Sequence, residues 1–320
     1  MKPTKVKAWP ELVDYLPSLP TMREKQRSEI GEKASVEIDF GSVRSVSSTG
    51  VAIFLLRLMR LLQGGATPTV RTDCSPDIRS KLETLGAFRL LGVMLGPTQN
   101  ELPFGEILGD GAPVASGDGF ALPIYKLSFE QGKNRRACIH TFVSWVAEHA
   151  SSISRSHKLQ SNGLCMLLNE ISKNTADHTQ CDALFGLDVR PIDKRRSKMT
   201  FAFGDLGIGI KQHIEQHLPP EQEKRRRHMS LYEAYRLALK PGYTSNRSSL
   251  LNKGYGMSII VDAANDLGFH LSIFDASSRG LLSGLDRLQE PTHSALRRVF
   301  HNVGHEVGFF YYASTILLRR

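Results

Sequence analysis

A stretch rich in glycine, proline and aspartate divides the sequence into two parts. It runs from Gly96 to Gly119 with the sequence GPTQNELPFGEILGDGAPVASGDG. This composition favours loops over helices and strands. Because the chain has 320 residues, each part is long enough to bury a core of its own. We expect a polar N-terminal leader over 1–33, a first domain with its linker over 34–115, and a second domain over 116–320.

The first domain is expected to alternate strands and helices. Residues 35–40 (SVEIDF) alternate polar and apolar side chains, as a strand does, and residues 48–63 have the spacing of a helix that Ser48 or Thr49 can cap. A strand at 68–72 and a helix from Pro76 to Leu85, which ends at Gly86, are expected to follow. This order predicts a small α/β layer.

The second domain is expected to combine several strands with several helices. The expected strands are residues 122–128, 183–190, 198–204, 269–274 and 307–318, and the expected helices are residues 136–152, 167–180, 230–239 and 254–267. The whole chain is therefore expected to belong to the α/β (α+β) class.

One predicted helix has polar side chains at regular spacing along an edge. In LLNEISKNTADHTQ (Leu167 to Gln180), Glu170, Asn174 and His178 follow one another at intervals of four residues. Residues four apart lie on the same side of a helix. The helix therefore presents a carboxylate, an amide and an imidazole in one line, beside an apolar face.

Two glycine-containing motifs follow this helix along the chain. Asp205-Leu-Gly207-Ile-Gly209 comes directly after a predicted strand, where the glycines allow a sharp turn beside the carboxylate. Gly254-Tyr-Gly256 opens an apolar helix, and free N–H groups at a helix start suit an anion such as phosphate. Taken singly, each motif also fits a plain turn that leads into a helix.

The order of these motifs resembles the GHKL family, the ATP-binding domains of gyrase, Hsp90, MutL, sensor histidine kinases and anti-sigma factor kinases. The resemblance covers about residues 120–318. It implies a Bergerat fold, a sandwich of helices on a mixed sheet, with ATP and Mg²⁺ as ligands. By resemblance, Asn174 holds Mg²⁺ against the triphosphate, and Glu170 is the catalytic acid or base that activates water or an acceptor hydroxyl. His178 matches a position that either lies near the phosphates or packs.

The same resemblance implies how the rest of the nucleotide is bound. Asp205 accepts from the adenine amino group, and Gly207 and Gly209 form a wall of the base pocket. Residues 211–253 become a lid over the nucleotide. The remaining ATP-binding residues implied are Thr244, Ser245, Lys253, Gly254, Gly256 and Met257. The sequence departs from the family in having Thr175 after the asparagine, and Gly304-His-Glu where many relatives have Gly-Thr, which puts one phosphate contact in doubt.

The first domain resembles the STAS domain of anti-sigma factor antagonists. The resemblance rests on VEIDF and VRSVSSTGVAIFLLRLMRL and covers about residues 34–96. Ser48 matches the hydroxyl that is phosphorylated in those proteins, which makes it a possible phosphoacceptor. Ser47 replaces the usual aspartate, however, and a helix N-cap is the preferred interpretation of Ser47, Ser48 and Thr49.

Composition limits the remaining choices. The longest apolar run, Val51 to Leu62, is interrupted by Arg57 and Arg60 and is shorter than a membrane span, and no signal peptide is recognised at the N-terminus. We therefore expect a cytoplasmic protein without membrane contact. The four cysteines show no metal-binding or disulfide spacing. The net charge of +9 is concentrated at 194–198 and 224–227, which we interpret as solvated surface rather than a nucleic-acid site.

These patterns lead to one main functional hypothesis and two alternatives. We expect an ATP-Mg²⁺-binding signalling protein with serine/threonine kinase activity of the anti-sigma type, acting on a STAS-domain or sigma-factor-like partner, or in cis at Ser48. The alternatives are an ATPase switch of the gyrase or Hsp90 kind, and a non-catalytic nucleotide-binding interaction module. A homodimer is compatible with each. The sequence identifies neither the partner nor the pathway.

Overall fold

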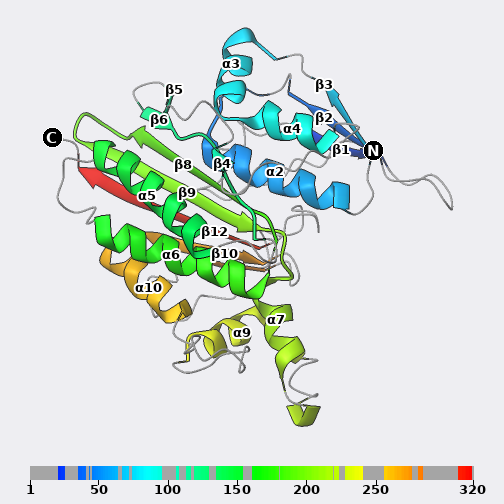
Figure 1. Ribbon diagram of the computed structural model, residues 1–320, viewed down its shortest axis with the longest axis vertical. Coiled ribbons are helices and arrows are strands. Elements are labelled where there is room, and N and C mark those ends of the chain that lie inside the picture. Colours follow the sequence, from blue (N-terminus) through cyan, green and yellow to red (C-terminus); the bar gives the residue numbers. More distant parts are fainter. Residues whose placement is uncertain are drawn as a thin grey trace.

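The structure of the chain is a computed structural model. It describes residues 21–25, 35–40, 43, 45–63, 67–71, 74–95, 106–107, 113–116, 119–129, 135–153, 161–179, 181–218, 220–222, 228–240, 256–275, 280–283 and 309–318. The described elements combine helices with two β-sheets (Figure 1). The chain therefore belongs to the α+β class, as the sequence predicts.

The larger sheet has nine strands and is antiparallel at every described pairing. Its main path runs β11-β10-β12-β9-β8-β6-β5, with β7 on β8 and β4 on β7. The two central strands, β8 and β9, are buried over most of their length, because their apolar residues face a helical layer on each side. The strand bounds are β4 Glu106–Ile107, β5 Val114–Ser116, β6 Gly119–Ala121, β7 Tyr125–Leu127, β8 Ala183–Pro191, β9 Arg196–Asp205, β10 His270–Asp275, β11 Gly280–Ser283 and β12 Phe309–Leu318.

One face of this sheet is covered by helices α5 (Arg135–Ile153), α6 (Ser161–His178) and α10 (Gly256–Asp266), as Figure 1 shows. Apolar side chains of α6 and α10 pack there with alternate residues of the strands, such as Phe185 and Leu187 of β8. Helices α7 (Gly209–His217) and α9 (Leu231–Ala238) pack on each other at one end of the sheet. A 3₁₀ turn, η2, spans Pro220–Gln222.

The smaller sheet has three strands and mixed pairing. β1 (Thr21–Lys25) is antiparallel to β2 (Ser35–Asp39), and β2 is parallel to β3 (Thr67–Arg71). Helix α2 (Ser48–Gln63) connects the two parallel strands, and α3 (Pro76–Thr84) and α4 (Ala87–Leu95) follow. β1 lies inside the region that we expected to be a polar leader. The sequence does not predict this strand, because TMREK shows no alternation of polar and apolar residues.

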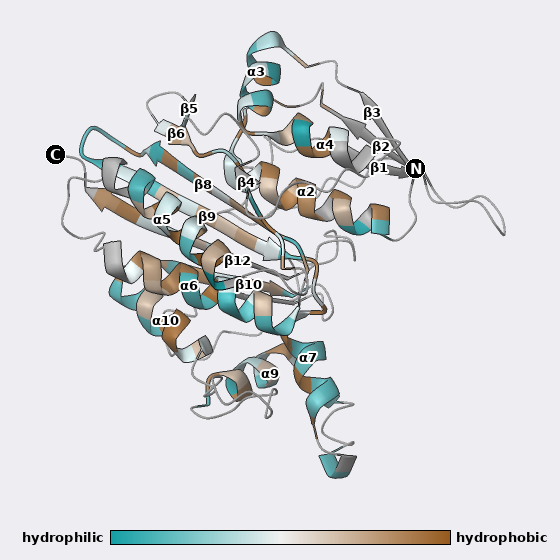
Figure 2. Ribbon diagram, in the orientation of Figure 1, coloured by the Kyte–Doolittle hydropathy of each residue, from teal (hydrophilic) through white to brown (hydrophobic). Residues whose placement is uncertain are grey.

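Helix α2 packs on the face of the larger sheet that α5 and α6 leave open. Most of α2 is hydrophobic and is coloured brown in Figure 2. Its apolar side chains form a second core with Leu184 of β8 and Leu206 after β9. Ala121 and Ile124, from beyond the glycine-rich linker, belong to this core as well. The two parts of the chain therefore share one sheet, with a separate core on each face.

Among the described residues, no helix has the length and apolar character that a bilayer span requires.

Candidate functional site

A buried carboxylate at the end of β9 is the centre of the candidate site. Asp205 accepts a hydrogen bond from the backbone N–H of Gly207 at 2.7 Å and one from the Thr175 hydroxyl at 3.1 Å. Burial raises the pKa of Asp205 from 3.8 to about 7, although the hydrogen bonds from Gly207 and Thr175 lower it, and the charge of Asp275 raises it further. This carboxyl can therefore change its protonation state near neutral pH.

The polar line on α6 reaches the same end of the sheet. The hydrogen bond of Thr175 joins α6 directly to Asp205. The neighbouring residue, Asn174, is partly exposed. One turn earlier, the Glu170 side chain is 13% exposed, with its carboxylate 3.9 Å from the Lys173 ammonium. Glu170 is thus open enough to meet a ligand and lies on the same edge as Asn174.

The start of α10 completes the arrangement. A Cβ built on Gly256 would lie 2.7 Å from Oδ1 and 3.3 Å from Nδ2 of Asn174. The first turn of α10 therefore lies close against the Asn174 amide, and a residue larger than glycine at position 256 would displace that side chain. Met257, the next residue, is buried in the main core. Three motifs that are far apart in the sequence meet here: α6, the end of β9 and the N-terminus of α10.

Tyr311 of β12 holds the Asn174 side chain from the sheet below. A hydrogen bond joins the Tyr311 hydroxyl to Asn174, and burial, together with the charge of Asp205, raises the pKa of Tyr311. Tyr311 is therefore a neutral phenol that orients the amide.

The turn after β9 is held by a second buried carboxylate. Gly209 has φ +81°, and a Cβ there would lie 2.7 Å from the carboxyl group of Asp275. Asp275 ends β10 and accepts from the backbone N–H of Lys211 in the first turn of α7 at 3.1 Å. A Cβ on Gly207 would overlap the Thr179 side chain. Both glycines of the D-x-G-x-G motif are thus required by close packing.

His178 lies at the end of α6 in a group of three histidines. Its ring is 4.6 Å from that of His213, centroid to centroid, and the rings of His213 and His217 are 4.4 Å apart. Burial lowers the pKa of His178, and it lowers the pKa of His213 to about 4, so both rings are neutral at pH 7. Nδ1 of His178 has no hydrogen-bond partner in the described part of the chain. His178 therefore packs against α7, and its ring carries no charge for a phosphate.

Some of the predicted site residues either lie outside the described part of the chain or lie on another face of the sheet. Thr244, Ser245, Lys253 and Gly254 lie outside the described residues. Ser48 is fully buried on the opposite face of the sheet, where its hydroxyl accepts from the backbone N–H of Leu187 at 3.2 Å. Ser47 caps α2 by accepting from the N–H of Gly50 at 3.0 Å.

The sequence patterns did not single out Thr175, Asp275 and Tyr311 as site residues. A signal existed for Asp275, because it follows its strand directly, as Asp205 does. Thr175 stood out only as a departure from a family pattern, and Tyr311 had no motif. Within the described residues, no group of three or more His, Cys, Asp and Glu side chains is arranged to hold a metal ion.

No family model matches this sequence, and no curated protein matches it. Among solved structures, the chain is similar to one titled "Mycobacterial sensor histidine kinase MprB", with 16% sequence identity over 50% of this chain and 74% of that chain. The TM-score is 0.25. At this score, the likeness supports no inference about fold or function.

Proposed function

We propose that the chain binds ATP with Mg²⁺ and transfers the γ-phosphoryl group to a serine or threonine of a partner protein. One observation carries the proposal: Asp205, Asn174 and the start of α10 converge on one end of the sheet, linked by the Asp205–Thr175 hydrogen bond and the contact between Gly256 and Asn174. This convergence fits the GHKL resemblance of the sequence, in which the same three motifs bind the nucleotide.

The residues of the site match the parts of an adenine nucleotide. The ionised Asp205 accepts from an amino group on the base, and the turn at Gly207 and Gly209 gives the flat ring room beside it. The N–H groups at the start of α10 suit the phosphates. Thr244, Ser245, Lys253 and Gly254 are proposed to close over the phosphates from the lid.

The donor set at Asn174 fits Mg²⁺. This ion is commonly held by one or two protein oxygens together with waters and substrate phosphates, rather than by a cage of protein ligands. The Asn174 amide, oriented by Tyr311, supplies one such oxygen beside the helix start. When bound, Mg²⁺ would neutralise charge on the phosphates.

Glu170 is the proposed general base. An acceptor hydroxyl attacks the γ-phosphorus, the bond to the β–γ bridging oxygen breaks, and ADP leaves, while the Glu170 carboxylate takes the hydroxyl proton. Because Ser48 is buried on the far face of the sheet, we favour an acceptor in trans, on a partner that resembles an anti-sigma factor antagonist.

Labelled ATP tests this proposal. The purified chain is incubated with Mg²⁺ and γ-labelled ATP, alone and with a STAS-domain protein, beside Glu170→Ala, Asp205→Asn and the control Glu148→Ala, whose side chain is exposed on α5. We expect label on the STAS protein with the parent chain and the control. Glu170→Ala should lose transfer but retain nucleotide, and Asp205→Asn should lose both.

Other results separate the alternatives. Free phosphate that depends on Glu170, without labelled protein, would indicate an ATPase switch. Binding without turnover would indicate a non-catalytic module. Failure of the parent chain to bind ATP in a titration followed by fluorescence would refute the proposed function altogether.

A further inference from the structure

A hollow of about 960 Å³ lies at the end of the large sheet opposite Asp205. It is lined by the first half of α6, the last turn of α10 and the residues after it, the β8–β9 turn, the starts of β9 and β10, and the last residues of β12. α6 and α10 reach Asn174 with their other ends. The hollow is therefore distinct from the candidate nucleotide site, and both can be occupied together.

Exposed apolar side chains gather in this hollow. Three large hydrophobic residues are exposed in the part of the chain that the structure describes: Met166 at 46%, Ile192 at 47% and Ile316 at 57%. All three line the hollow, although they come from three different elements. Single exposed apolar residues are common, but a group of them around a concavity is typical of a binding site.

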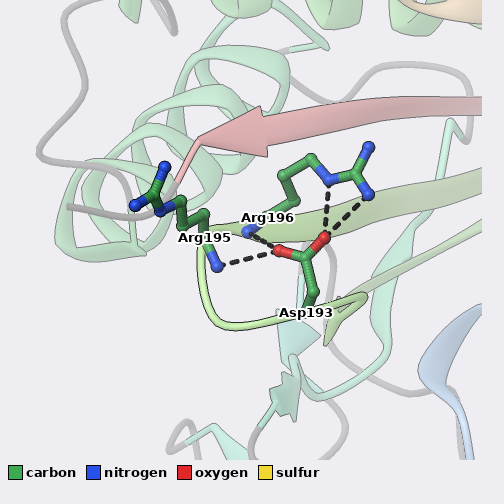
Figure 3. A network of polar contacts seen from close by, with 3 residues as sticks. All are labelled: Asp193, Arg195 and Arg196. Atoms are coloured by element: carbon green, nitrogen blue, oxygen red, sulfur yellow. Dashed lines mark hydrogen bonds and ion pairs between the residues drawn. The ribbon is translucent and has the colours of Figure 1, made fainter.

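The β8–β9 turn that carries Ile192 has a defined conformation. Asp193 accepts from the backbone N–H groups of Arg195 and Arg196 at 2.8 Å each, and from Nε of Arg196 at 2.7 Å (Figure 3). These hydrogen bonds hold the pKa of Asp193 below its usual value. The N–H of Ile192 donates to the Arg196 carbonyl at 2.9 Å. These hydrogen bonds therefore fix the backbone of the turn that carries Ile192.

The same turn and the start of β9 provide positive charge that no described acid neutralises. Asp193 pairs with Arg196, whereas Lys194, Arg195 and Lys198 form no ion pair with a described residue. Figure 3 shows the Arg195 guanidinium pointing away from Asp193. Lys198 lines the hollow, and Asp266 is the one acid among the described residues of its lining. Figure 2 shows this hydrophilic turn beside the hydrophobic end of β12.

We propose that this hollow docks an acidic amphipathic helix of a partner protein. Apolar side chains on one face of that helix would pack against Met166, Ile192 and Ile316, while its carboxylates would pair with Lys194, Arg195 and Lys198. A helix laid in a groove is a common recognition mode. Because the surface is concave and includes Asp266, a helix with an apolar ridge fits it better than a flat anionic bilayer.

A pair of designed peptides tests the proposal. One has leucine at helical spacing i, i+3, i+4 and i+7 with glutamate elsewhere; the other has lysine in place of every glutamate. Binding to the full chain is followed by fluorescence anisotropy at low and moderate salt. We expect the acidic peptide alone to bind, and more weakly as salt increases, because exposed charges are screened.

Variants of the chain locate the binding. Ile192→Ser with Ile316→Ser, and separately Lys194→Glu with Arg195→Glu, should each weaken binding of the acidic peptide at least about tenfold. Arg136→Glu, exposed on α5, is the charge control and should change it little. ATP binding and the urea midpoint of each variant show that it folds, and unchanged ATP binding keeps this test separate from the proposed function.

Four outcomes would overturn the proposal. The acidic peptide fails to bind, or it binds all variants equally. Sedimentation shows self-association of the parent chain that the Ile192 and Ile316 changes abolish, which would assign the surface to a second copy. Vesicles containing phosphatidylserine bind the parent chain better than the peptide does and lose binding with Lys194→Glu and Arg195→Glu, which would assign it to a membrane.

Discussion

At the scale of single residues, Asp205 makes the stability of the chain depend on pH. Its pKa is about 7 in the folded chain, against an ordinary value of 3.8 for an exposed aspartate. Below pH 4 both states hold the proton; between pH 4 and 7 only the folded state holds it, so the free energy of unfolding falls as pH rises. The expected loss is about 4 kcal/mol, because the two pKa values differ by about 3 units, and it is complete above pH 7.

Urea unfolding of the parent chain and Asp205→Asn between pH 4.5 and 8 measures this loss. Asparagine does not titrate, so the difference in unfolding free energy between the two should shift in favour of Asp205→Asn as pH rises. Asp262→Asn, an exposed change on α10, should run parallel to the parent chain. If the difference in unfolding free energy between Asp205→Asn and the parent chain stayed constant with pH, burial would not keep the Asp205 carboxyl protonated.

Gly209 is predicted to tolerate no side chain. It has φ +81°, and the Asp275 carboxyl lies 2.7 Å from the place that a Cβ would take. Gly209→Ala should therefore lower the free energy of unfolding by about 1–3 kcal/mol. It should also weaken nucleotide binding, because the turn after Asp205 would shift. Thermal unfolding and an ATP titration measure the two effects.

Gly92→Ala is the matched control for Gly209→Ala. Gly92 lies exposed within α4, and a Cβ there meets no atom within 4 Å. Alanine has the higher helix propensity, so this change should stabilise by about 0.5–1 kcal/mol. Equal effects at the two glycines would contradict the role assigned to the turn.

The sequence predicts only those site residues that a local sequence pattern marks. Asn174, Asp205, Gly207 and Gly209 can be named because spacing or a strand end marks them. Asp275 and Tyr311 matter through contacts made across β12, β10 and α6, and strand pairing of this range cannot be inferred from periodicity. Whether these residues bind nucleotide stays a prediction.

At the scale of elements, one buried carboxylate binds the start of α2 to the sheet. Asp188 of β8 accepts from the N–H of Ser48 at 2.8 Å, from the N–H of Thr49 at 2.9 Å and from the Thr49 hydroxyl. Burial raises the pKa of Asp188, because it disfavours the charged form, while the hydrogen bonds from Thr49 and Ser48 lower it. The carboxyl group thus accepts hydrogen bonds from the free N–H groups in the first turn of α2, a helix that is distant from Asp188 in the sequence.

Asp188→Ala should detach the start of α2. The change leaves two N–H groups and a hydroxyl without an acceptor in a buried place, at a cost of about 3 kcal/mol in unfolding free energy. Hydrogen exchange should show faster exchange at Ser48 and Thr49. The control is Asp77→Ala, an exposed acid in the first turn of α3 that pairs with Lys81, which should cost under about 1 kcal/mol. Unchanged exchange in Asp188→Ala would contradict the attachment.

Elements with strong periodicity are predicted well from the sequence, and short or polar ones are not. Helix α2 has the predicted bounds, and the strands β8, β9 and β10 lie within a few residues of theirs. Helix α7 is missed because its sequence GIKQHIEQH is mostly polar. The edge strands β5 and β11 have three and four residues, too few for a period to show.

At the scale of the whole molecule, the two parts of the chain are joined through a shared sheet. The composition of the linker led us to expect two separate domains. Composition indicates where a chain forms loops, but it does not indicate which segments before and after the loop pack together. Consecutive residues of β8 point to opposite faces, so Leu184 belongs to the core with α2 and Leu187 to the core with α5 and α6. One strand therefore takes part in both cores.

This arrangement predicts that the chain unfolds as one cooperative unit. Leu184→Ala and Leu187→Ala remove the same atoms from fully buried positions on the two faces, and each should cost about 2–5 kcal/mol. Urea unfolding is followed by hydrogen exchange of α2 on one side and α6 on the other. Both helices should lose protection at the same urea concentration, lowered in both variants. If Leu184→Ala exposed α2 while α6 stayed protected at the parent midpoint, the two cores would be independent and the shared sheet would not couple them.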